Sequence, residues 1–578
     1  MPALKEFKEE NAMDGKLTGY PSIDKPWLKY FPEEATAVTL PEGSMYEYLR
    51  DCNQSEQDDI AIVYYGKKIT YRQLLESIRK TAAAFSALGI KKGDVVPILL
   101  PNIPENIYAL YALNYLGAVA DMVDLRSQGD ALIHYYNETN ASVAVICDLF
   151  ADATLEILNQ TGLKTIIVAS PFDSLPRPLK IMAKMKNHYR CPQQFIPWNQ
   201  FFREEHEEVA SAGETDDIAC LFHTSGTTGF PKGVMMTNRN ANAMALQGIY
   251  SRLRFEHGKR MMNQVPPFLA FNIICSLHMP LALHMTMMLL PEYRPDKFSE
   301  NIVKTKATAC LAGPADWSNF LTNPKTKNKK IDLSNMINPL CGSDSLAKET
   351  REAINAKMKE NGCTVEILEG YGMTEIGSAA CCNLPGHVVD GSVGVPFPFN
   401  NFCIYDNDKK EELPYGKSGE ICMAGPTVMK GYYNNPEETD KVLIRHSDNI
   451  LWLHSGDLGH MDENGNVFLE GRLKRLIVQF EGFKIPPAVL EETICRHPDV
   501  SACCVVGIPD KEHGFGQLPV AFVVLRENAE LVEDELRQLC KKELAPKYQP
   551  YEYHVVSALP LTPNGKVDYR VLEKEAVQ

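Results

Sequence analysis

One segment constrains this chain more than any other: residues Thr224 to Val234 read Thr-Ser-Gly-Thr-Thr-Gly-Phe-Pro-Lys-Gly-Val. The preceding run, Ile218 to Phe222, is short, apolar and partly β-branched, which predicts a buried strand, and Arg239 to Arg252 favour a helix. The segment is therefore expected to join a strand to a helix. Its glycines let backbone amides approach an anion, its hydroxyls add donors, and its lysine adds a full charge. We predict a polyphosphate loop formed by Thr224, Ser225, Gly226, Thr227, Thr228, Gly229 and Lys232.

The segment is not a Walker A loop. That pattern ends in Gly-Lys-Ser/Thr, whereas here Pro231 precedes Lys232 and Gly233 follows it. An ordinary Gly/Thr turn is the alternative interpretation, but many specified positions in one short run disfavour it. The nucleotide class must therefore come from other features.

The same run closely resembles the phosphate loop of the adenylate-forming superfamily, whose signature is Thr-Ser-Gly-Thr-Thr-Gly-x-Pro-Lys-Gly. This superfamily contains acyl-CoA synthetases, firefly-type luciferases and nonribosomal-peptide adenylation domains. The resemblance implies that ATP is the nucleotide. It extends over roughly residues 45 to 575.

The chain alternates apolar β-type runs with helical ones. Strands are expected at 60–65, 67–71, 95–100, 117–123, 143–147 and 165–169, with helices between several of them. With 578 residues, two or more domains are expected. We predict an N-terminal arm (1–44), a large N-terminal AMP-binding domain of layered α/β units (45–473) and a small, mobile α+β C-terminal domain (474–578).

Composition excludes some classes of protein. A net charge of −15 without long Lys/Arg runs argues against nucleic-acid partners. The sixteen cysteines form no Cys-x-x-Cys pair, and the N-terminus resembles no signal peptide, so we expect buried thiols and a cytoplasmic location. The apolar stretch 273–290 holds two histidines and a proline, which favours a buried helix and strand over a membrane span.

A second motif, Leu368 to Glu375, reads Leu-Glu-Gly-Tyr-Gly-Met-Thr-Glu and follows a strand expected at Val365 to Leu368. Its side chains should lie at a strand's carboxyl end, where ligands gather in α/β sheets. By resemblance, Tyr371 stacks on adenine, Thr374 binds the α-phosphate and Glu375 helps to hold Mg²⁺, as a hard cation requires. The remaining AMP-binding residues that the resemblance implies here are Gly370, Gly372, Met373 and, from the looser match at Cys341 to Leu346, Gly342.

Two later motifs resemble the part of the family's site that binds the ribose of the nucleotide. Asp457 ends the run Leu451 to Asp457, and a carboxylate can accept hydrogen bonds from both ribose hydroxyls. Arg472 matches the family's ribose-contacting arginine. The interdomain hinge that follows is expected at Lys474 or Arg475, because a charged residue suits a position exposed in two poses.

The segment expected to form the acyl pocket departs from the family's pattern. Where the family usually has Pro-x-Phe-His, this chain has Leu269 in place of the histidine. We expect Phe268, Leu269, Phe271 and Ile273 to line the pocket, while plain core packing is an equally weighted alternative.

The C-terminal region supplies two further residues by resemblance. Gly482 matches the glycine that lines the thiol tunnel of CoA ligases, and Lys566 matches the catalytic lysine near the chain's end. A lysine on a glycine-containing turn is usually only a solvated charge. The ordered series of motifs favours the catalytic role.

Together these features predict an AMP-forming acyl-CoA synthetase that uses ATP, Mg²⁺ and CoA. Lys232, Thr374, Glu375 and Lys566 would stabilise charge during adenylation. Residues 266–278 contain no acidic residue to pair with an amino group, so a hydrophobic acid is favoured over an amino acid. Loading of a phosphopantetheinyl carrier protein is the main alternative, and a luciferase-like oxygenase or an inactive binding protein is less favoured.

Overall fold

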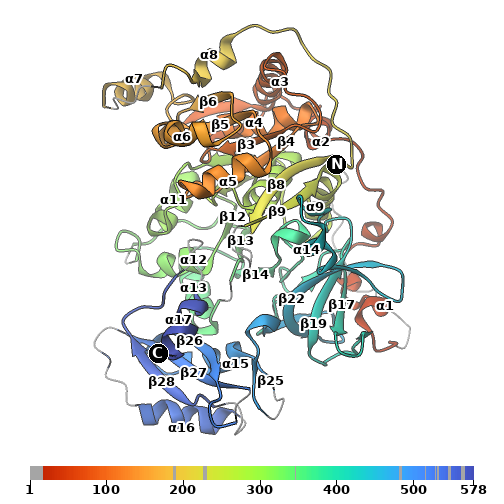
Figure 1. The fold of residues 1–578 in the computed structure, drawn as a ribbon, viewed down its shortest axis with the longest axis vertical. Coiled ribbons are helices and arrows are strands. Elements are labelled where there is room, and N and C mark those ends of the chain that lie inside the picture. The colour runs from red at the N-terminus through yellow and green to blue at the C-terminus, as the bar shows by residue number, and fades with distance from the viewer. Residues whose placement is uncertain are drawn as a thin grey trace.

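The computed structural model describes residues 17–186, 191–224, 231–327, 329–344, 346–480, 484–513, 516–526, 529, 533–544, 549–561 and 567–577. Figure 1 shows a large upper body, a third sheet at its lower right and a small C-terminal unit below.

The first sheet of the large body contains the strands on either side of the predicted phosphate loop. Its order is β20-β9-β8-β4-β3-β5-β6-β7, and the strands from β8 through β7 run parallel. Its strands are β3 (Val95–Leu99), β4 (Val119–Met122), β5 (Val143–Cys147), β6 (Thr165–Ala169), β7 (Ile196–Pro197), β8 (Ile218–Thr224), β9 (Lys232–Thr237) and β20 (Gly431–Tyr432).

The second sheet carries the Tyr371 motif. Its order is β16-β15-β14-β13-β12-β10-β11-β1-β2, and the strands from β14 through β1 run parallel. Its strands are β1 (Ile60–Tyr64), β2 (Lys67–Thr70), β10 (Arg260–Asn263), β11 (Thr286–Leu289), β12 (Ala309–Ala312), β13 (Asn338–Cys341), β14 (Leu368–Tyr371), β15 (Cys381–Cys382) and β16 (Val395–Pro396).

Helices cover these sheets, and one cluster of buried side chains joins both sheets into a common core. Helix α4 is buried along its whole length and therefore carries apolar side chains on all faces, together with the buried polar residues Glu105, Asn106 and Asn114. The larger helices of this body are α2 (Met45–Cys52), α3 (Tyr71–Ala87), α4 (Pro104–Tyr115), α5 (Asp130–Glu138), α6 (Ala151–Ile157), α7 (Arg177–Lys186), α8 (Trp198–Arg203), α9 (Asn238–Tyr250), α11 (Phe298–Thr305), α12 (Pro314–Thr322) and α13 (Lys348–Glu360).

The third sheet is antiparallel and follows the large sheets in the chain. It is built from β17 (Asn401–Asp406), β18 (Glu411–Glu412), β19 (Gly419–Ala424), β21 (Leu443–Arg445), β22 (Leu451–Met461) and β23 (Val467–Arg472). The short helices α1 (Pro21–Asp24) and α14 (Pro436–Asp440) lie beside this part of the chain. Trp27, from the N-terminal segment, is fully buried and packs edge-on against Phe402 of β17.

The C-terminal unit has its own hydrophobic clusters, which contain residues between Ile477 and Leu572 and none from the large sheets. In its described residues it contains a three-stranded sheet, a two-stranded sheet and three helices, in agreement with the predicted α+β class. Its elements are β24 (Ile477–Val478), β25 (Lys484–Ile485), α15 (Pro487–Cys495), β26 (Val500–Pro509), β27 (Gln517–Leu525), α16 (Glu533–Glu543), β28 (Glu552–Val556) and α17 (Tyr569–Val577).

Two local predictions are wrong. The phosphate-loop segment follows β8 but precedes the antiparallel strand β9, not a helix, and α9 begins only after Thr237. Antiparallel pairing with β8 makes Lys232–Thr237 a strand, whereas Thr237 caps α9 by accepting a hydrogen bond from the Asn240 amide. The strand expected at 365–368 is displaced to Leu368–Tyr371, so Tyr371 ends the strand instead of following it.

The stretch 273–290 forms the end of a π-helix (Phe271–His278), helix α10 (Met279–Ala282) and strand β11. This agrees with the predicted buried helix and strand. In the part of the chain that the structure describes, no helix is both long and apolar enough to cross a membrane. All sixteen cysteines are free thiols, and most of them are buried, as predicted.

Candidate active site

Three neighbouring parallel strands bring the first candidate residues together. Gly313, Gly342 and the Gly370 motif come at the carboxyl ends of β12, β13 and β14, which pair in that order. A Cβ built on Gly342 would lie 3.6 Å from the Gly370 carbonyl oxygen and 3.7 Å from the Phe271 ring. The adenosine-side and acyl-side motifs therefore meet at one edge of the sheet, where α/β folds bind ligands.

The turn after β14 is closed to larger residues. A Cβ on Gly372 would lie 1.9 Å from the Ser378 carbonyl oxygen, so this position requires glycine. Thr374 and Glu375 then begin a 3₁₀ turn that ends at Ile376. The tight backbone places Met373, Thr374 and Glu375 directly beside the strand end.

Tyr371, Asp457 and Arg472 form a connected group across two sheets. The Tyr371 hydroxyl donates to Asp457 Oδ2 at 2.7 Å, and Arg472 Nε lies 2.7 Å from Asp457 Oδ1. Asp457 and Arg472 are directly opposite each other on β22 and β23. Burial, and then the Asp457 carboxylate, raises the pKa of Tyr371 well above its usual range, so the phenol stays protonated as a donor.

Glu375 is linked to Lys232 through Tyr432. The Tyr432 hydroxyl donates to Glu375 Oε1 at 2.9 Å, and Lys232 Nζ lies 4.9 Å from the centre of the Tyr432 ring. Burial raises the pKa of Glu375, while hydrogen bonding and the positive charges of Arg472 and Lys232 oppose that rise. Lys232 also forms an ion pair with Glu438.

The Glu375 carboxylate fits the predicted Mg²⁺ ligand. It is 6% exposed and retains acceptor capacity beyond the bond from Tyr432, and carboxylate oxygen is a preferred ligand of this hard cation. Lys232 and Arg472 supply further positive charge nearby. A carboxylate, a hydroxyl and positive charge therefore lie close together here, as the binding of a polyphosphate with its metal ion requires.

Several predicted site residues lie outside the described residues. They are Ser225, Gly226, Thr227, Thr228 and Gly229 of the phosphate loop, Gly482 of the thiol tunnel and the catalytic candidate Lys566. Thr224 is described, and it pairs with Lys232 at the end of the β8–β9 ladder. This pairing places both ends of the predicted loop together.

The acyl-side residues divide into two kinds of environment. Ile273 is 1% exposed and packs in the main core, as the alternative interpretation expected. Phe271 faces Gly342, while the Arg126 guanidinium lies 5.0 Å from the centre of the Phe268 ring. Leu269 is partly buried one residue after Phe268.

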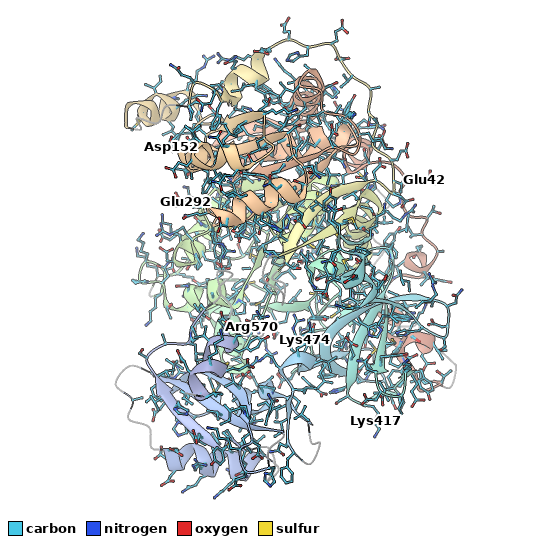
Figure 2. The ribbon with its side chains drawn as sticks, viewed as in Figure 1. Glu42, Asp152, Glu292, Lys417, Lys474 and Arg570 are labelled. Carbon is cyan, nitrogen blue, oxygen red and sulfur yellow. The ribbon has the colours of Figure 1, made fainter. Side chains whose placement is uncertain are left out.

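The two hinge candidates also differ. Lys474 is exposed, and Figure 2 labels it where the chain passes from the third sheet to the C-terminal unit. Arg475 is partly buried, contacts Glu491 at 2.5 Å and lies 5.2 Å from the centre of the Tyr569 ring. Lys474 therefore meets the predicted criterion of exposure, whereas Arg475 is fixed within the C-terminal unit.

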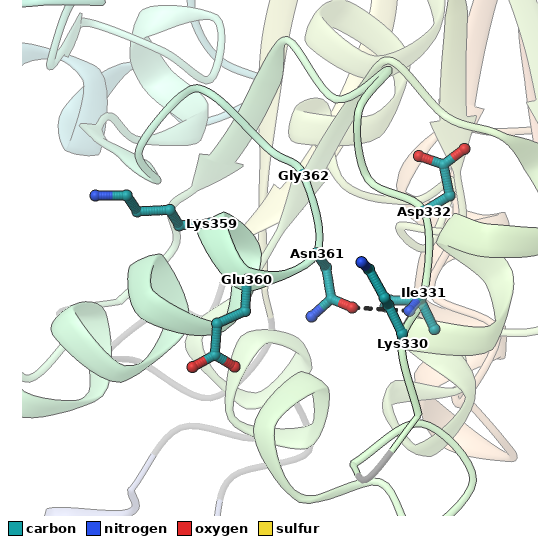
Figure 3. Close-up of a pocket in the computed structure, with 7 residues that line it drawn as sticks. All are labelled: Lys330, Ile331, Asp332, Lys359, Glu360, Asn361 and Gly362. Carbon is teal, nitrogen blue, oxygen red and sulfur yellow. Dashed lines mark hydrogen bonds between the residues drawn. The ribbon is translucent and has the colours of Figure 1, made fainter.

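Figure 3 shows a separate surface pocket lined by Lys330, Ile331, Asp332, Lys359, Glu360, Asn361 and Gly362. Asn361 Oδ1 accepts a hydrogen bond from the Ile331 amide at 2.7 Å inside it. These residues precede β13 and β14 in the chain. The pocket is therefore at the opposite edge of the sheet from the Tyr371 group.

Sequence reasoning missed Tyr432 and Glu438, which contact Glu375 and Lys232. Both are about 60 residues or more from their nearer partner in the chain, so no short motif could have linked them. No local pattern marks Gly431 and Tyr432, because their pairing with β9 is a tertiary contact.

Comparisons with known proteins agree with this geometry. The family model described as AMP-binding enzyme matches residues 49–433, and the model for the AMP-binding enzyme C-terminal domain matches residues 489–566. A long-chain-fatty-acid–CoA ligase of Bacillus subtilis is 31% identical, over 95% of this chain and 98% of that protein. A 4-coumarate–CoA ligase of Solanum tuberosum is 28% identical, over 86% and 87% of the two chains.

Solved structures show the same fold. ATP-bound MatB from Rhodopseudomonas palustris aligns with a TM-score of 0.78 and 25% identity, over 92% of this chain and 98% of that one. An anthranilate–CoA ligase bound to anthranoyl-AMP aligns with a TM-score of 0.79 at 22% identity, over 94% and 98%. The second comparison supports the fold alone.

The fold and the strand-end site define an adenylate-forming enzyme with a large and a small domain. The chain belongs to the AMP-binding enzyme family. The predicted superfamily, the predicted class of AMP-forming acyl-CoA synthetase and the use of ATP, Mg²⁺ and CoA are thereby confirmed at the level of the family.

Proposed function

We propose that this protein activates a hydrophobic carboxylic acid with ATP and transfers the acyl group to CoA. The observation that carries the proposal is that Asp457 and Arg472 of the third sheet meet Tyr371 at the sheet edge that also holds Gly342, in a chain of this family. Its relatives are named for a long-chain fatty acid and for 4-coumarate, both largely apolar acids. A cytoplasmic location is consistent with the sixteen free thiols.

In the first half-reaction, an oxygen of the substrate carboxylate attacks the α-phosphorus of ATP. The new carbonyl–oxygen–phosphorus link forms as the bond to pyrophosphate breaks. Lys232, Lys566 and Thr374 would stabilise the negative charge of the transition state, and Mg²⁺ held by Glu375 would supply additional charge neutralisation. Tyr371 and Asp457 would hold the adenosine, with Arg472 orienting the Asp457 carboxylate.

In the second half-reaction, the CoA sulfur attacks the acyl carbon and AMP leaves. Gly482 would lie along the path of the thiol, and rotation of the C-terminal domain about Lys474 would exchange Lys566 for Gly482. The domain limits are proposed at 45–473 and 474–578, after an N-terminal arm of residues 1–44. The separate hydrophobic clusters of the two parts support a division in this region.

The acid's polarity is inferred from the acyl side. Residues 266–278 contain no Asp or Glu, and Phe271 offers apolar surface beside Gly342. An α-ammonium group would lack a local carboxylate partner and would be costly to desolvate. A neutral hydrocarbon or aromatic tail therefore suits this site better than an amino acid.

Exchange of labelled pyrophosphate into ATP tests the first half-reaction. A panel of fatty, aromatic and amino acids should give exchange with hydrophobic acids, and only when Mg²⁺ is present. Exchange with amino acids alone would overturn the substrate class. Failure of every acid would favour the inactive binding-protein alternative.

The acceptor is tested by supplying CoA or a phosphopantetheinylated carrier protein after adenylation. Acyl-CoA and AMP should form with CoA. Accumulation of acyl adenylate until carrier protein is added would instead identify a carrier-loading enzyme.

A further inference from the structure

A compact group of metal-ligand side chains lies on the third sheet, outside the site described above. Cys422 is on β19, His454 is on β22, and His446 follows the end of β21. Their ligand atoms, the Cys422 thiol sulfur and one ring nitrogen of each histidine, all lie within 4.8 Å of one another. Three soft or borderline ligands from three chain segments therefore face one point.

The two imidazoles are already turned toward each other. His446 Nε2 and His454 Nε2 are 2.9 Å apart. Nitrogens bound to one tetrahedral Zn²⁺ lie about 3.3 Å apart, because Zn–N bonds are about 2.0–2.1 Å long. The rings would need to separate by only a few tenths of an ångström to accept an ion between them and Cys422.

Surrounding contacts hold the histidines in this orientation. His454 Nδ1 is 2.7 Å from Glu420 Oε2, so it donates there and leaves Nε2 as the ligand atom. The Tyr405 ring stacks on His446, with ring centres 4.0 Å apart. Cys422 is fully buried, and Glu420 and His454 are 5% and 7% exposed.

We propose that Cys422, His446 and His454 bind a Zn²⁺ ion, with Glu420 orienting His454 from the outside. One thiolate and two imidazoles suit Zn²⁺, and a water molecule would complete the tetrahedron. Binding displaces the thiol proton of Cys422 into solvent and moves the His446 ring proton from Nε2 to Nδ1. A carboxylate behind a metal-bound histidine is the common arrangement in zinc proteins.

Another group of possible ligands, Glu56, Asp59, His257 and His284, provides a useful contrast. Its two carboxylates and His257 are exposed and already form ion pairs, such as Glu56 with His257 at 2.7 Å. It also lacks a cysteine. Solvated charge pairing explains that group, whereas it does not explain a buried thiol facing two imidazoles.

The location suggests a structural role for the ion. Glu420 Oε1 accepts a hydrogen bond from the Gly456 amide at 2.7 Å, and Asp457 follows immediately. An ion that fixes His454 and Glu420 would therefore steady the part of β22 that leads to Asp457. Metal binding itself does not depend on the proposed ligase activity.

The test uses the full-length protein, stripped with a chelator under a thiol reductant and then dialysed against Zn²⁺ or Co²⁺. We expect one tightly held zinc per chain and a higher melting temperature with zinc than with chelator. The Co²⁺ form should show a sulfur-to-cobalt charge-transfer band together with the intense visible bands of a tetrahedral site.

Matched variants separate this site from adventitious binding elsewhere. Cys422→Ala and His446→Gln should lose the zinc and the cobalt spectrum, while Cys310→Ala and His460→Gln should keep both. Cys310 is equally buried on β12, and His460 is on the same strand as His454. Glu420→Gln should weaken zinc binding by about 10- to 100-fold.

His446→Gln is the decisive variant because His446 is only partly buried and its replacement should not prevent folding. The inference is overturned if the wild-type protein holds no zinc after dialysis. It is equally overturned if His446→Gln binds zinc as tightly as the wild type.

Discussion

Arg472 and Arg475 are three residues apart, yet they belong to different parts of the molecule. Arg472 ends β23 and pairs with Asp457 on the large domain. Arg475 pairs with Glu491 on the C-terminal unit, donates to the Val505 carbonyl oxygen at 3.1 Å and contacts the Tyr569 ring. Between these two side chains, the chain passes from the large domain to the C-terminal unit.

This difference marks where the chain passes from one hydrophobic core to the other. The large-domain core extends to Val467, and the core of the C-terminal unit begins at Ile477. The exposed Lys474 lies in the short connection between them. Rotation there would leave the Tyr371–Asp457–Arg472 group intact while carrying Arg475 with the C-terminal unit.

The largest expected effect comes from the C-terminal side. Lys566→Ala should slow adenylation by on the order of a hundred- to thousand-fold, because losing one positioned electrostatic donor costs about 2.7–4 kcal/mol. Conversion of synthetic acyl adenylate and CoA to acyl-CoA should stay near the native rate. Single-turnover assays of each half-reaction measure the two effects separately.

Lys574→Ala is the matched control, since Lys574 is an exposed lysine on α17. It should change neither half-reaction. Equal impairment of both half-reactions by Lys566→Ala would show that the two domains do not alternate as the contrast between Arg472 and Arg475 suggests.

The next effect is on stability. Arg475→Ala leaves Glu491 without its cationic partner and with only the hydrogen bond from the Val505 amide, and breaking a largely buried ion pair costs up to about 3–5 kcal/mol. Urea unfolding followed by hydrogen exchange should show the loss in the C-terminal unit and not in β22 or β23. Arg496→Ala, which removes an exposed pair with Glu543, should cost less than about 1 kcal/mol.

Destabilisation of β22 and β23 by Arg475→Ala would contradict the assignment of Arg475 to the C-terminal unit. The corresponding change on the other side of the connection, Arg472→Ala, should affect nucleotide binding instead.

A smaller effect is expected for the group formed by Tyr371, Asp457 and Arg472. Tyr371→Phe removes the hydroxyl that donates to Asp457 but keeps the ring, and Arg472 still pairs with the carboxylate. A hydrogen bond to a charged group contributes about 1.5–3 kcal/mol. Because Arg472 still pairs with Asp457, we expect a loss near the lower end of this range, which corresponds to a roughly tenfold decrease in kcat/KM for ATP. Steady-state kinetics with saturating acid and CoA measure it.

Tyr415→Phe provides the control, because Tyr415 also donates to a carboxylate, Asp24 Oδ2 at 3.0 Å, away from the site. It should leave kcat/KM for ATP unchanged. An unaltered value for Tyr371→Phe as well would remove the Tyr371–Asp457 contact from nucleotide binding.

Much of this arrangement was predictable from local sequence. The apolar periodicity of the first 170 residues located most strands, and the Tyr371 and Asp457 motifs pointed to residues that do meet. The strand after the phosphate loop was missed because Lys232–Thr237 carries weak β signals and is held by pairing with β8. Tyr432 and Glu438 were missed because their contacts depend on distant parts of the chain.

The hinge illustrates the same limit. Lys474 and Arg475 are adjacent basic residues, and no local pattern distinguishes them. Only tertiary contacts, such as the one with Glu491 on helix α15, assign Arg475 to the C-terminal unit.

The smallest expected effect is a shift in pH dependence at Glu375. Burial raises the pKa of this carboxyl, so the fold favours its protonated form, and its contribution to stability is lost as pH rises through the raised pKa. Mg²⁺ binding has the opposite requirement, since the carboxylate must be ionised. The apparent affinity for Mg²⁺ should therefore fall as pH decreases through that raised pKa. Tyr432→Phe removes a hydrogen bond that lowers the pKa, and should move this loss to higher pH. The control Tyr433→Phe should leave the pH of this loss unchanged. The measurement is KM for Mg²⁺ as a function of pH in the wild type, Tyr432→Phe and Tyr433→Phe. Coincident profiles for all three would show that Glu375 does not control metal binding.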